Sequence, residues 1–266
     1  MIVDFHMHSF PDAIAAPALA KLAETAGIAP VGRATVSDTL EKLEQWRVDR
    51  GVLLNIATNP RQQGHINDHV IRINREHGDR VTAFGSVHFA NEDITAELER
   101  LYENGVQGIK IHPTYQACLI NDKRWEEAYR ACERLGLIVV AHAGYDPYDK
   151  DVIWATPRQS AEVVDAFPKL KLVLAHLGGL YQWDEVEREL VGKNVYFDTA
   201  MCDGQIDPAQ YLRIIRHHGS QRIVLGSDCP WHSTEQEIAR LRTLGLTDVE
   251  ERRILGENAA ELLGLS

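Results

Sequence analysis

The chain has 266 residues and a formal net charge of −11, which disfavours binding to nucleic acid or to an anionic membrane surface. Its apolar fraction of 44% can fill a core, and its four cysteines form no CxxC pair, so we expect neither a structural zinc ribbon nor a disulfide framework. The cysteines are expected to be small buried residues. Without a basic leader, a cleavage site or a membrane-length apolar run, the sequence favours a cytoplasmic protein.

Strand-like runs rich in β-branched residues alternate with amphipathic stretches along the chain. The predicted strands cover residues 2–8, 51–56, 81–87, 107–112, 137–142, 171–176, 194–199 and 222–227. The predicted helices cover residues 37–50, 65–77, 92–104, 122–135, 157–167, 184–191, 207–218 and 234–244. This alternation is typical of βα units and favours an α/β fold of the (β/α)8 TIM barrel type. The alternative, an open doubly wound sheet, normally carries a glycine-rich turn after its first strand, and this chain does not.

No linker or low-complexity tract divides the chain, so we expect one domain over residues 1–266. The first crossover helix is predicted to begin after an N-cap at Ser37 and to end at Gly51. Residues 9–36 form an insertion between this helix and the first strand. It would be a lid or a wall of the substrate site, or else a helical decoration or the contact of a homodimer.

Six of the predicted strands end in a histidine or an aspartate. Their sequences are IVDFHMH, GIKIH, LIVVAH, KLVLAH, NVYFD and RIVLGSD. Parallel strands bring their carboxyl ends to the same mouth of a barrel, which is where barrel enzymes hold their chemistry. Imidazole and carboxylate groups are ligands of Zn²⁺ and similar ions. The sequence therefore predicts an enzyme with a divalent metal ion at this mouth.

The two histidines of the first strand, His6 and His8, are two residues apart and so project to the same face. Asp4 shares their parity, lies one layer deeper and would orient a ligand. The aspartate of the last strand, Asp228, is either a metal ligand that also accepts a proton or the cap of the next helix. Five histidines on predicted helices are expected at the surface. They are His65, His69, His77, His217 and His218.

The motifs DFHMH, GIKIHP, AHAG, AHLGG, GSD and ILGENAAELLGL together resemble those of the amidohydrolase superfamily. More narrowly, they resemble the branch that includes aminocarboxymuconate-semialdehyde decarboxylase. The resemblance spans essentially the whole chain and implies a distorted (β/α)8 barrel with a divalent metal at its mouth. It implies His6, His8, His142 and Asp228 as the metal ligands, with His176 facing the metal-bound water or the substrate. We expect Zn²⁺ as the ion, with Mn²⁺ as the alternative.

The strand-four lysine, Lys110, admits three roles. In binuclear members of the superfamily a lysine at this place is carbamylated and bridges two metal ions, so the resemblance allows a second ion. In the resembling branch the site is usually mononuclear, and we place a single ion first. Alternatively, Lys110 is a barrel lysine paired with Asp4 or Asp198. Its neighbour in parity, His112, is expected to line the substrate site.

Further residues after the strand ends are expected to contact a small planar or cyclic acid, lactone or amide. Beside His112 and Lys110, the predicted substrate-binding set consists of Tyr115, Gln116, Trp154, Arg158 and Trp231. The alternative for the aromatic members is that they pack the loops against one another.

The expected reaction is hydrolysis, in which metal-activated water attacks a carboxamide, ester or lactone carbonyl. Asp228 would act as base and ligand, and His176 would stabilise the oxyanion. The alternative is a non-oxidative decarboxylase with the same ligands, and a non-catalytic metal-binding protein ranks third. Nuclease relatives carry a glutamate where this chain has Lys110 and His112, and deaminase relatives carry a His-Ala-Glu element where it has AHAG (141–144), so both activities are disfavoured.

Overall fold

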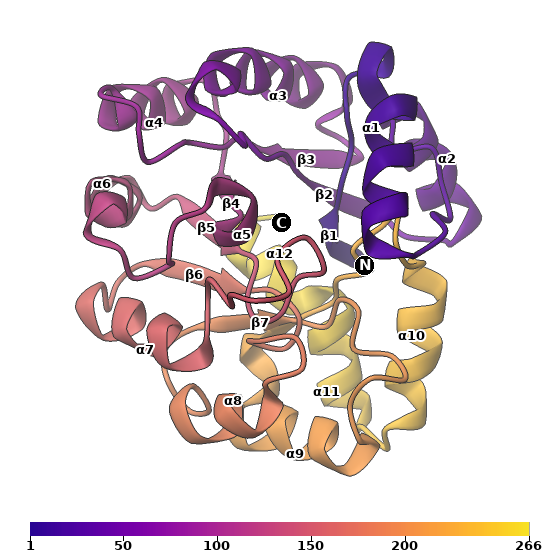
Figure 1. The fold of residues 1–266 in the computed structure, drawn as a ribbon. Helices are drawn as coiled ribbons and strands as arrows, with labels where there is room; N and C mark the ends of the chain where they lie inside the picture. Colours follow the sequence, from indigo (N-terminus) through magenta and orange to yellow (C-terminus); the bar gives the residue numbers. More distant parts are fainter. Residues whose placement is uncertain (266) are drawn as a thin grey trace.

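The computed structural model of the protein describes residues 1–265, in which parallel strands lie at the centre and helices surround them (Figure 1). The strands are β1 (Val3–Met7), β2 (Arg50–Leu54), β3 (Val81–Phe84), β4 (Gly108–Ile111), β5 (Ile138–Ala141), β6 (Lys171–Leu174), β7 (Tyr196–Asp198) and β8 (Ile223–Val224). The helices are α1 (Asp12–Ala26), α2 (Val36–Gln45), α3 (Gln63–His77), α4 (Ile94–Glu103), α5 (Pro113–Gln116), α6 (Glu126–Leu135), α7 (Pro157–Ala166), α8 (Trp183–Glu189), α9 (Pro208–His218), α10 (Thr234–Thr243), α11 (Asp248–Arg252) and α12 (Asn258–Leu263), with a π-helical turn η4 (Arg253–Glu257).

The strands close into a ring in two arcs. Strands β1 to β3 pair in order, as do β4 to β8, and every pair is parallel. Between β3 and β4 the arcs meet at a bridge of Gly85 with Ile109. Between β8 and β1 they meet where the Phe5 amide donates to the Leu225 carbonyl at 2.7 Å and Met7 bridges Cys229. The predicted α/β barrel is confirmed.

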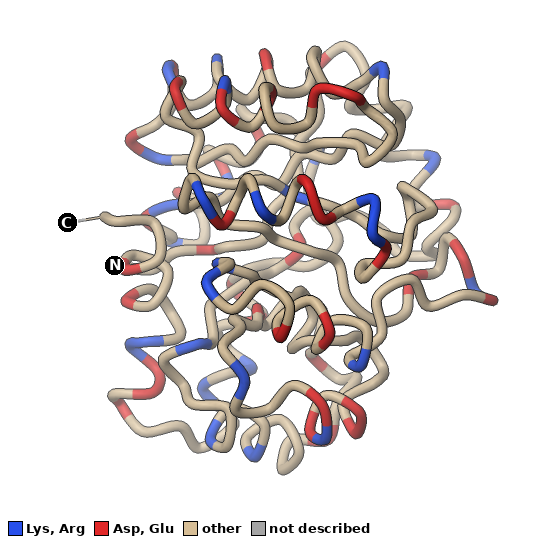
Figure 2. The backbone as a smooth tube through the Cα atoms, turned by 90° about the vertical axis from the view of Figure 1, so that its left-hand side faces the viewer, with Lys and Arg blue, Asp and Glu red and all other residues tan. Residues whose placement is uncertain are grey.

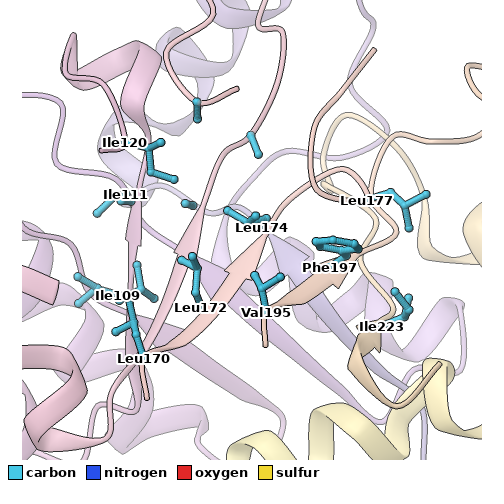
Figure 3. Close-up of a cluster of buried hydrophobic side chains, with 14 of the residues drawn as sticks. Ile109, Ile111, Ile120, Leu170, Leu172, Leu174, Leu177, Val195, Phe197 and Ile223 are labelled. Carbon is cyan, nitrogen blue, oxygen red and sulfur yellow. The ribbon is translucent and has the colours of Figure 1, made fainter. Parts of the chain in front are cut away.

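Two apolar layers hold this ring. The inner layer fills the barrel with alternate strand residues, among them Phe5 and Phe84, whose rings meet edge to face. Helix α12 packs against β1 and β8 and closes the end of the barrel opposite the mouth. The outer layer lies between strands and helices, and Figure 3 shows part of it on β4, β6, β7 and β8, including Ile109, Leu172 and Phe197. All four cysteines are buried and free, as predicted.

Helix α2 differs from its prediction at both ends. It begins after Thr35, whose side chain accepts the Asp38 amide at 3.1 Å, rather than after Ser37. It ends at Gln45 instead of continuing to residue 50, because Arg47 adopts a left-handed conformation (φ 56°) and Arg50 already belongs to β2. The insertion 9–36 contains α1, which buries only Ala15 and Leu19.

Charged residues of both signs are interspersed along the outer helices on the side shown in Figure 2. They form surface ion pairs such as Arg100 with Asp68 at 2.8 Å. Such pairs contribute at most about 1 kcal/mol each, so the stability of the fold rests on its apolar layers. Within residues 1–265 no helix is long and apolar enough to cross a membrane.

A glycine after β5 allows two loops of the barrel mouth to touch. Gly144 has φ +86°, and a Cβ there would lie 2.1 Å from the Leu180 backbone nitrogen. Gly192 also has φ +86°, but a Cβ there would meet nothing within 4 Å. Alanine substitutions at Gly144 and Gly192 therefore separate the cost of backbone strain from the cost of steric overlap.

We predict that Gly144→Ala lowers the free energy of unfolding by about 3 kcal/mol or more, because it adds overlap with backbone atoms to the strain of a left-handed alanine. Gly192→Ala should cost only the strain, about 1–2 kcal/mol. Urea denaturation of both variants measures the difference. Equal losses would show that the close approach to Leu180 is not a constraint.

Candidate active site

A bulge in β1 turns the two histidines of the first strand toward the mouth of the barrel. Asp4 pairs with Gly51 but Met7 pairs with Leu53, so β1 carries one extra residue between these points. Within this stretch Phe5 faces the inner layer, and His6 reaches the polar groups at the mouth. The alternation of side chains between the two faces of β1, which the sequence predicts, does not hold across this bulge.

The bulge also changes the position of Asp4. Its carboxylate accepts the Ser227 hydroxyl at 2.6 Å, the Thr234 hydroxyl at 2.5 Å and the His6 amide at 3.1 Å. Asp4 therefore contacts no histidine ring and orients the backbone of the first strand instead. Burial raises the pKa of this carboxyl to about 6, against the effect of these hydrogen bonds.

The first cluster of ligand-type atoms consists of His6, His8 and Asp228, whose ligand atoms all lie within 4.8 Å of one another. The two Nε2 atoms are 3.1 Å apart, and Asp228 Oδ1 lies 3.0 Å from that of His8 and 3.5 Å from that of His6. His6 Nδ1 is 2.8 Å from Asp198 Oδ2, and His8 Nδ1 is 2.7 Å from the Leu54 carbonyl. These contacts fix both rings through Nδ1 and leave both Nε2 atoms on the side of the carboxylate.

The protonation states favour the same use of this cluster. Burial, and then the Lys110 charge, hold the pKa of His6 well below its usual value, so the ring is neutral. Burial would raise the pKa of Asp228, but His6 and His8 outweigh it and hold that pKa well below its usual range. Two ring nitrogens and one carboxylate oxygen that face one another are a ligand set that fits a divalent cation, which would replace any proton shared between them. Gly226 leaves room for the arrangement, since a Cβ there would lie 2.9 Å from His6 Cβ.

A second cluster consists of His112, His142 and Asp146, all buried. Asp146 Oδ2 lies 3.6 Å from His112 Nε2 and 3.8 Å from His142 Nε2. Burial lowers the pKa of both imidazoles and raises the pKa of Asp146 to about 6. The ligand-type atom of His142 lies within 4.8 Å of those of His112 and Asp146, and its expected place beside His6, His8 and Asp228 as a metal ligand stays a prediction. Asp146 was not foreseen, because an aspartate in a loop four residues after a strand-end histidine has no periodicity to mark it.

His176 lies next to both clusters. Its Nε2 is 3.1 Å from His142 Nδ1, and its ring is 5.5 Å from that of His6 between centroids. Its Nδ1 lies 3.0 Å from the Ala200 carbonyl, which fixes the ring. The backbone has φ 60°, a left-handed conformation held by a hydrogen bond from the His176 amide to Asp198 Oδ1 at 2.9 Å. The ring is positioned to pass a proton to or from a neighbour.

Lys110 is fully buried, and its Nζ has no hydrogen-bond partner among residues 1–265. Burial lowers its pKa to about 8, opposed by Asp198, Asp228 and Asp146. The predicted pairing with Asp198 is therefore electrostatic and not a direct ion pair, and Asp4 is not among these carboxylates. An ammonium group without a direct partner, near one carboxylate of each cluster, is suited to hold an anion.

The other predicted substrate-binding residues divide into three groups. Tyr115 stacks on His112 with ring centroids 3.8 Å apart, which places it beside the second cluster. Gln116 donates to the Ala57 and Val87 carbonyls and accepts the His112 amide, so its side chain ties loops together. The side chains of the remaining three make no hydrogen bond to either cluster among residues 1–265. Trp154 donates to Asp149, Trp231 follows Asp228 in a turn, and Arg158 is exposed on α7.

Comparisons with known proteins agree with this architecture. A family model described as amidohydrolase matches residues 3–265. An uncharacterised TIM-barrel protein from Bordetella bronchiseptica superimposes with a TM-score of 0.78 at 18% identity, over 99% of this chain and 98% of that one. For 5-carboxyvanillate decarboxylase from Sphingomonas paucimobilis the TM-score is 0.74 at 16% identity, over 100% and 99%. A dihydroxybenzoic acid decarboxylase from Polaromonas sp. JS666, with bound manganese and the inhibitor 2-nitroresorcinol, gives 0.73 at 16% identity, over 99% and 97%.

Proposed function

This chain belongs to the amidohydrolase family, and from that premise we propose that it is an enzyme that decarboxylates a small unsaturated or aromatic acid with the help of one divalent metal ion. The observation that carries the proposal is the buried Lys110 ammonium, which lacks a hydrogen-bond partner among residues 1–265 and lies near the carboxylate of a metal-ligand cluster. Such a site suits an anionic substrate. Two of the superimposed proteins are named as decarboxylases, which is why we place this reaction before hydrolysis.

His6, His8 and Asp228 would hold the ion, because their three ligand atoms face one another within 4.8 Å. When bound, the ion supplies a Lewis acid that attracts the oxygen atoms of the substrate. Two imidazoles and one carboxylate suit Zn²⁺, and they also suit Mn²⁺, the ion bound by the Polaromonas protein. Asp198 and the Leu54 carbonyl would keep the two rings in place through Nδ1.

The reaction breaks one carbon–carbon bond, releases CO₂ and leaves the electron pair on the substrate carbon, which then takes up a proton. Lys110 Nζ would hold an anionic group of the substrate. His176 in its protonated form would deliver the proton from Nε2, and solvent would replace that proton after the product has left. Burial of these groups keeps bulk water from competing for the carbon.

Hydrolysis of a lactone, ester or amide is the second candidate, and the description of the matching family model supports it. Asp228 would then be the base, since the facing histidines keep it ionised. The two reactions share the metal ligands and differ in their products.

We predict that metal-loaded protein, screened against carboxylated aromatic acids and carboxylated lactones, releases CO₂ from an aromatic or unsaturated acid. In D₂O the product should carry one deuterium at the carbon that lost the carboxylate. Headspace analysis and proton NMR measure the two results, and protein with His6→Ala serves as the inactive control. Ring opening of a lactone without CO₂ release would reject decarboxylation in favour of hydrolysis.

A further inference from the structure

The loop after β8 holds Asp228 in a strained conformation. Its φ of 65° is left-handed, and a residue other than glycine keeps such a conformation only where its surroundings hold it. Toward the first strand the backbone holds it, because the Asp228 amide donates to the His6 carbonyl at 2.7 Å. The His8 amide also donates to the carbonyl of the next loop residue, Cys229, at 2.6 Å. Toward α10 the loop ends at His232, next to the helix cap.

Helix α10 places a buried carboxylate beside His232. Glu237 is 0% exposed, and neither of its carboxylate oxygens makes a hydrogen bond within residues 1–265. Its Oε1 lies 3.3 Å from Nδ1 of His232, whose side chain is 21% exposed. An ionised carboxylate that is removed from water is costly unless a positive charge lies beside it. The protonated form of His232 is therefore the partner that this buried group requires.

The groups around the pair of His232 and Glu237 add mainly negative charge. Asp203, in the loop after β7, lies 4.0 Å from His232 Nε2. The guanidinium of Arg240 pairs with the other oxygen of Asp203 at 3.4 Å, and not with Glu237. Other titratable groups that face the pair are acidic or neutral, and they are Asp4, Asp228, Cys202 and Tyr211. These surroundings favour a proton on the pair.

The pKa shifts of the two groups agree with this geometry. Contact with Glu237, opposed by burial, raises the pKa of His232 above its usual value. Burial, opposed by His232, raises the pKa of Glu237 to about 7. Because the pKa of His232 is raised in the folded chain, its pairing stabilises the fold below the usual pKa of about 6.5. That contribution is lost as the pH rises through the raised value.

We propose that Glu237 is a positioning residue whose buried carboxylate holds the protonated His232 and, through it, the loop that keeps Asp228 in its left-handed conformation. The Trp231 amide, next to His232, donates to the Asp228 carbonyl at 2.8 Å, so a loop released at His232 loses its hold on Asp228 as well. The effect on metal binding rests on the proposed function, which assigns Asp228 as a ligand. The effect on the loop does not.

The first measurements use the metal-free protein. An NMR titration, with the signal assigned by its loss in His232→Gln, is expected to give His232 a pKa above 6.5. Glu237→Gln keeps the shape of the side chain and removes its charge, so it should lower this pKa to 6.5 or below. At pH 6.5, hydrogen exchange of the Trp231 amide should become about tenfold faster in Glu237→Gln. This difference should decline as the pH rises through the pKa of His232.

Two further variants separate charge from packing. Glu237→Asp retains the charge and should recover part of both changes. Glu235→Gln, an exposed change on the same helix, should cause neither. An unchanged pKa of His232 in Glu237→Gln, or unchanged exchange of the Trp231 amide, overturns the proposal.

A titration with Zn²⁺ in competition with a chromophoric chelator then measures the effect on the site of His6, His8 and Asp228. Glu237→Gln should weaken Zn²⁺ binding about tenfold, as loss of a group that supports a metal ligand does, and Glu235→Gln should not. Equal Zn²⁺ affinity in the wild type and Glu237→Gln overturns the positioning of Asp228. A wild-type chain that binds no Zn²⁺ but shows both metal-free changes rejects the proposed metal site and supports the hold of Glu237 on the loop.

Discussion

Replacing His6 by alanine should remove the catalytic ion from the first cluster and lower kcat/KM by about 10³-fold or more. A bound ion supplies several kcal/mol of transition-state stabilisation, and each 1.4 kcal/mol corresponds to about tenfold in rate. His6 has no substitute, because its Nε2 lies 3.1 Å from that of His8 and its Nδ1 is held by Asp198. Metal content after gel filtration and the rate with the best substrate measure the two effects.

Asp228→Asn should give a similar loss of rate, since the amide lacks the charge that faces His6 and His8. His65→Ala provides the matched control, because this histidine is exposed on α3 and far from any ligand group in the sequence. Circular dichroism of each variant checks that the barrel has formed. If His6→Ala retained both the ion and the wild-type rate, the first cluster would not be the catalytic centre.

Replacing Lys110 by methionine should separate stability from activity. Methionine fills a similar volume without charge, so the proposed anchor for the substrate anion disappears. We expect kcat/KM to fall by about 10²-fold, mainly through KM, which corresponds to loss of a buried charge contact of 2–5 kcal/mol. Steady-state kinetics over a range of substrate concentrations checks this. A variant with unchanged KM would show that Lys110 does not hold the substrate.

The same variant should be more stable in the metal-free protein. The pKa of Lys110 falls from 10.5 to about 8 because burial disfavours the charged form. Below pH 8 both folded and unfolded chains carry the charge, and the fold bears the full cost, about 3 kcal/mol. As the pH rises from 8 toward 10.5 the folded chain becomes neutral first, so this cost declines.

Urea denaturation should therefore show Lys110→Met about 3 kcal/mol more stable than the wild type at pH 7, with the gain about halved near pH 9.5. Lys171→Met, at the exposed start of β6, should show neither effect. A gain that stays constant with pH would point to packing by methionine instead of relief of a buried charge.

The barrel itself could be predicted because its signals are local. Each strand is a short run of β-branched residues, and the order of strands and helices then limits the closure to few topologies. The convergence of His6, His8 and Asp228 follows from their positions at strand ends. No long-range contact had to be known for these conclusions, since every parallel strand ends at the same mouth.

Other features depend on contacts that no local pattern encodes. The bulge in β1 is visible only through the pairing of Asp4 and Met7 with β2, so the expected position of Asp4 was inaccurate. Asp146 reaches the mouth from a loop, where an aspartate is ordinary. The grouping of His142 with Asp146 depends on how that loop folds back.

The burial of His218 could have been predicted from the sequence. The prediction of His218 at the surface was wrong, because its ring is buried against Phe197 and its Nε2 contacts the Val195 carbonyl at 2.8 Å. The residues Tyr211, Ile214 and Ile215 mark the buried face of α9. Position 218 lies on the same face of the helix, because it follows residues 214 and 215 at helical spacing. Its burial is therefore set by its position on the helix and not by its residue type.

The first cluster joins the first strand of the barrel to the last. During synthesis, His6 and His8 leave the ribosome early, and Asp228 follows only after nearly the whole chain. A nascent chain therefore has two of the three proposed ligands, and the proposed site is incomplete until β8 has docked beside β1. Metal loading of the proposed site should thus be a late event in biogenesis.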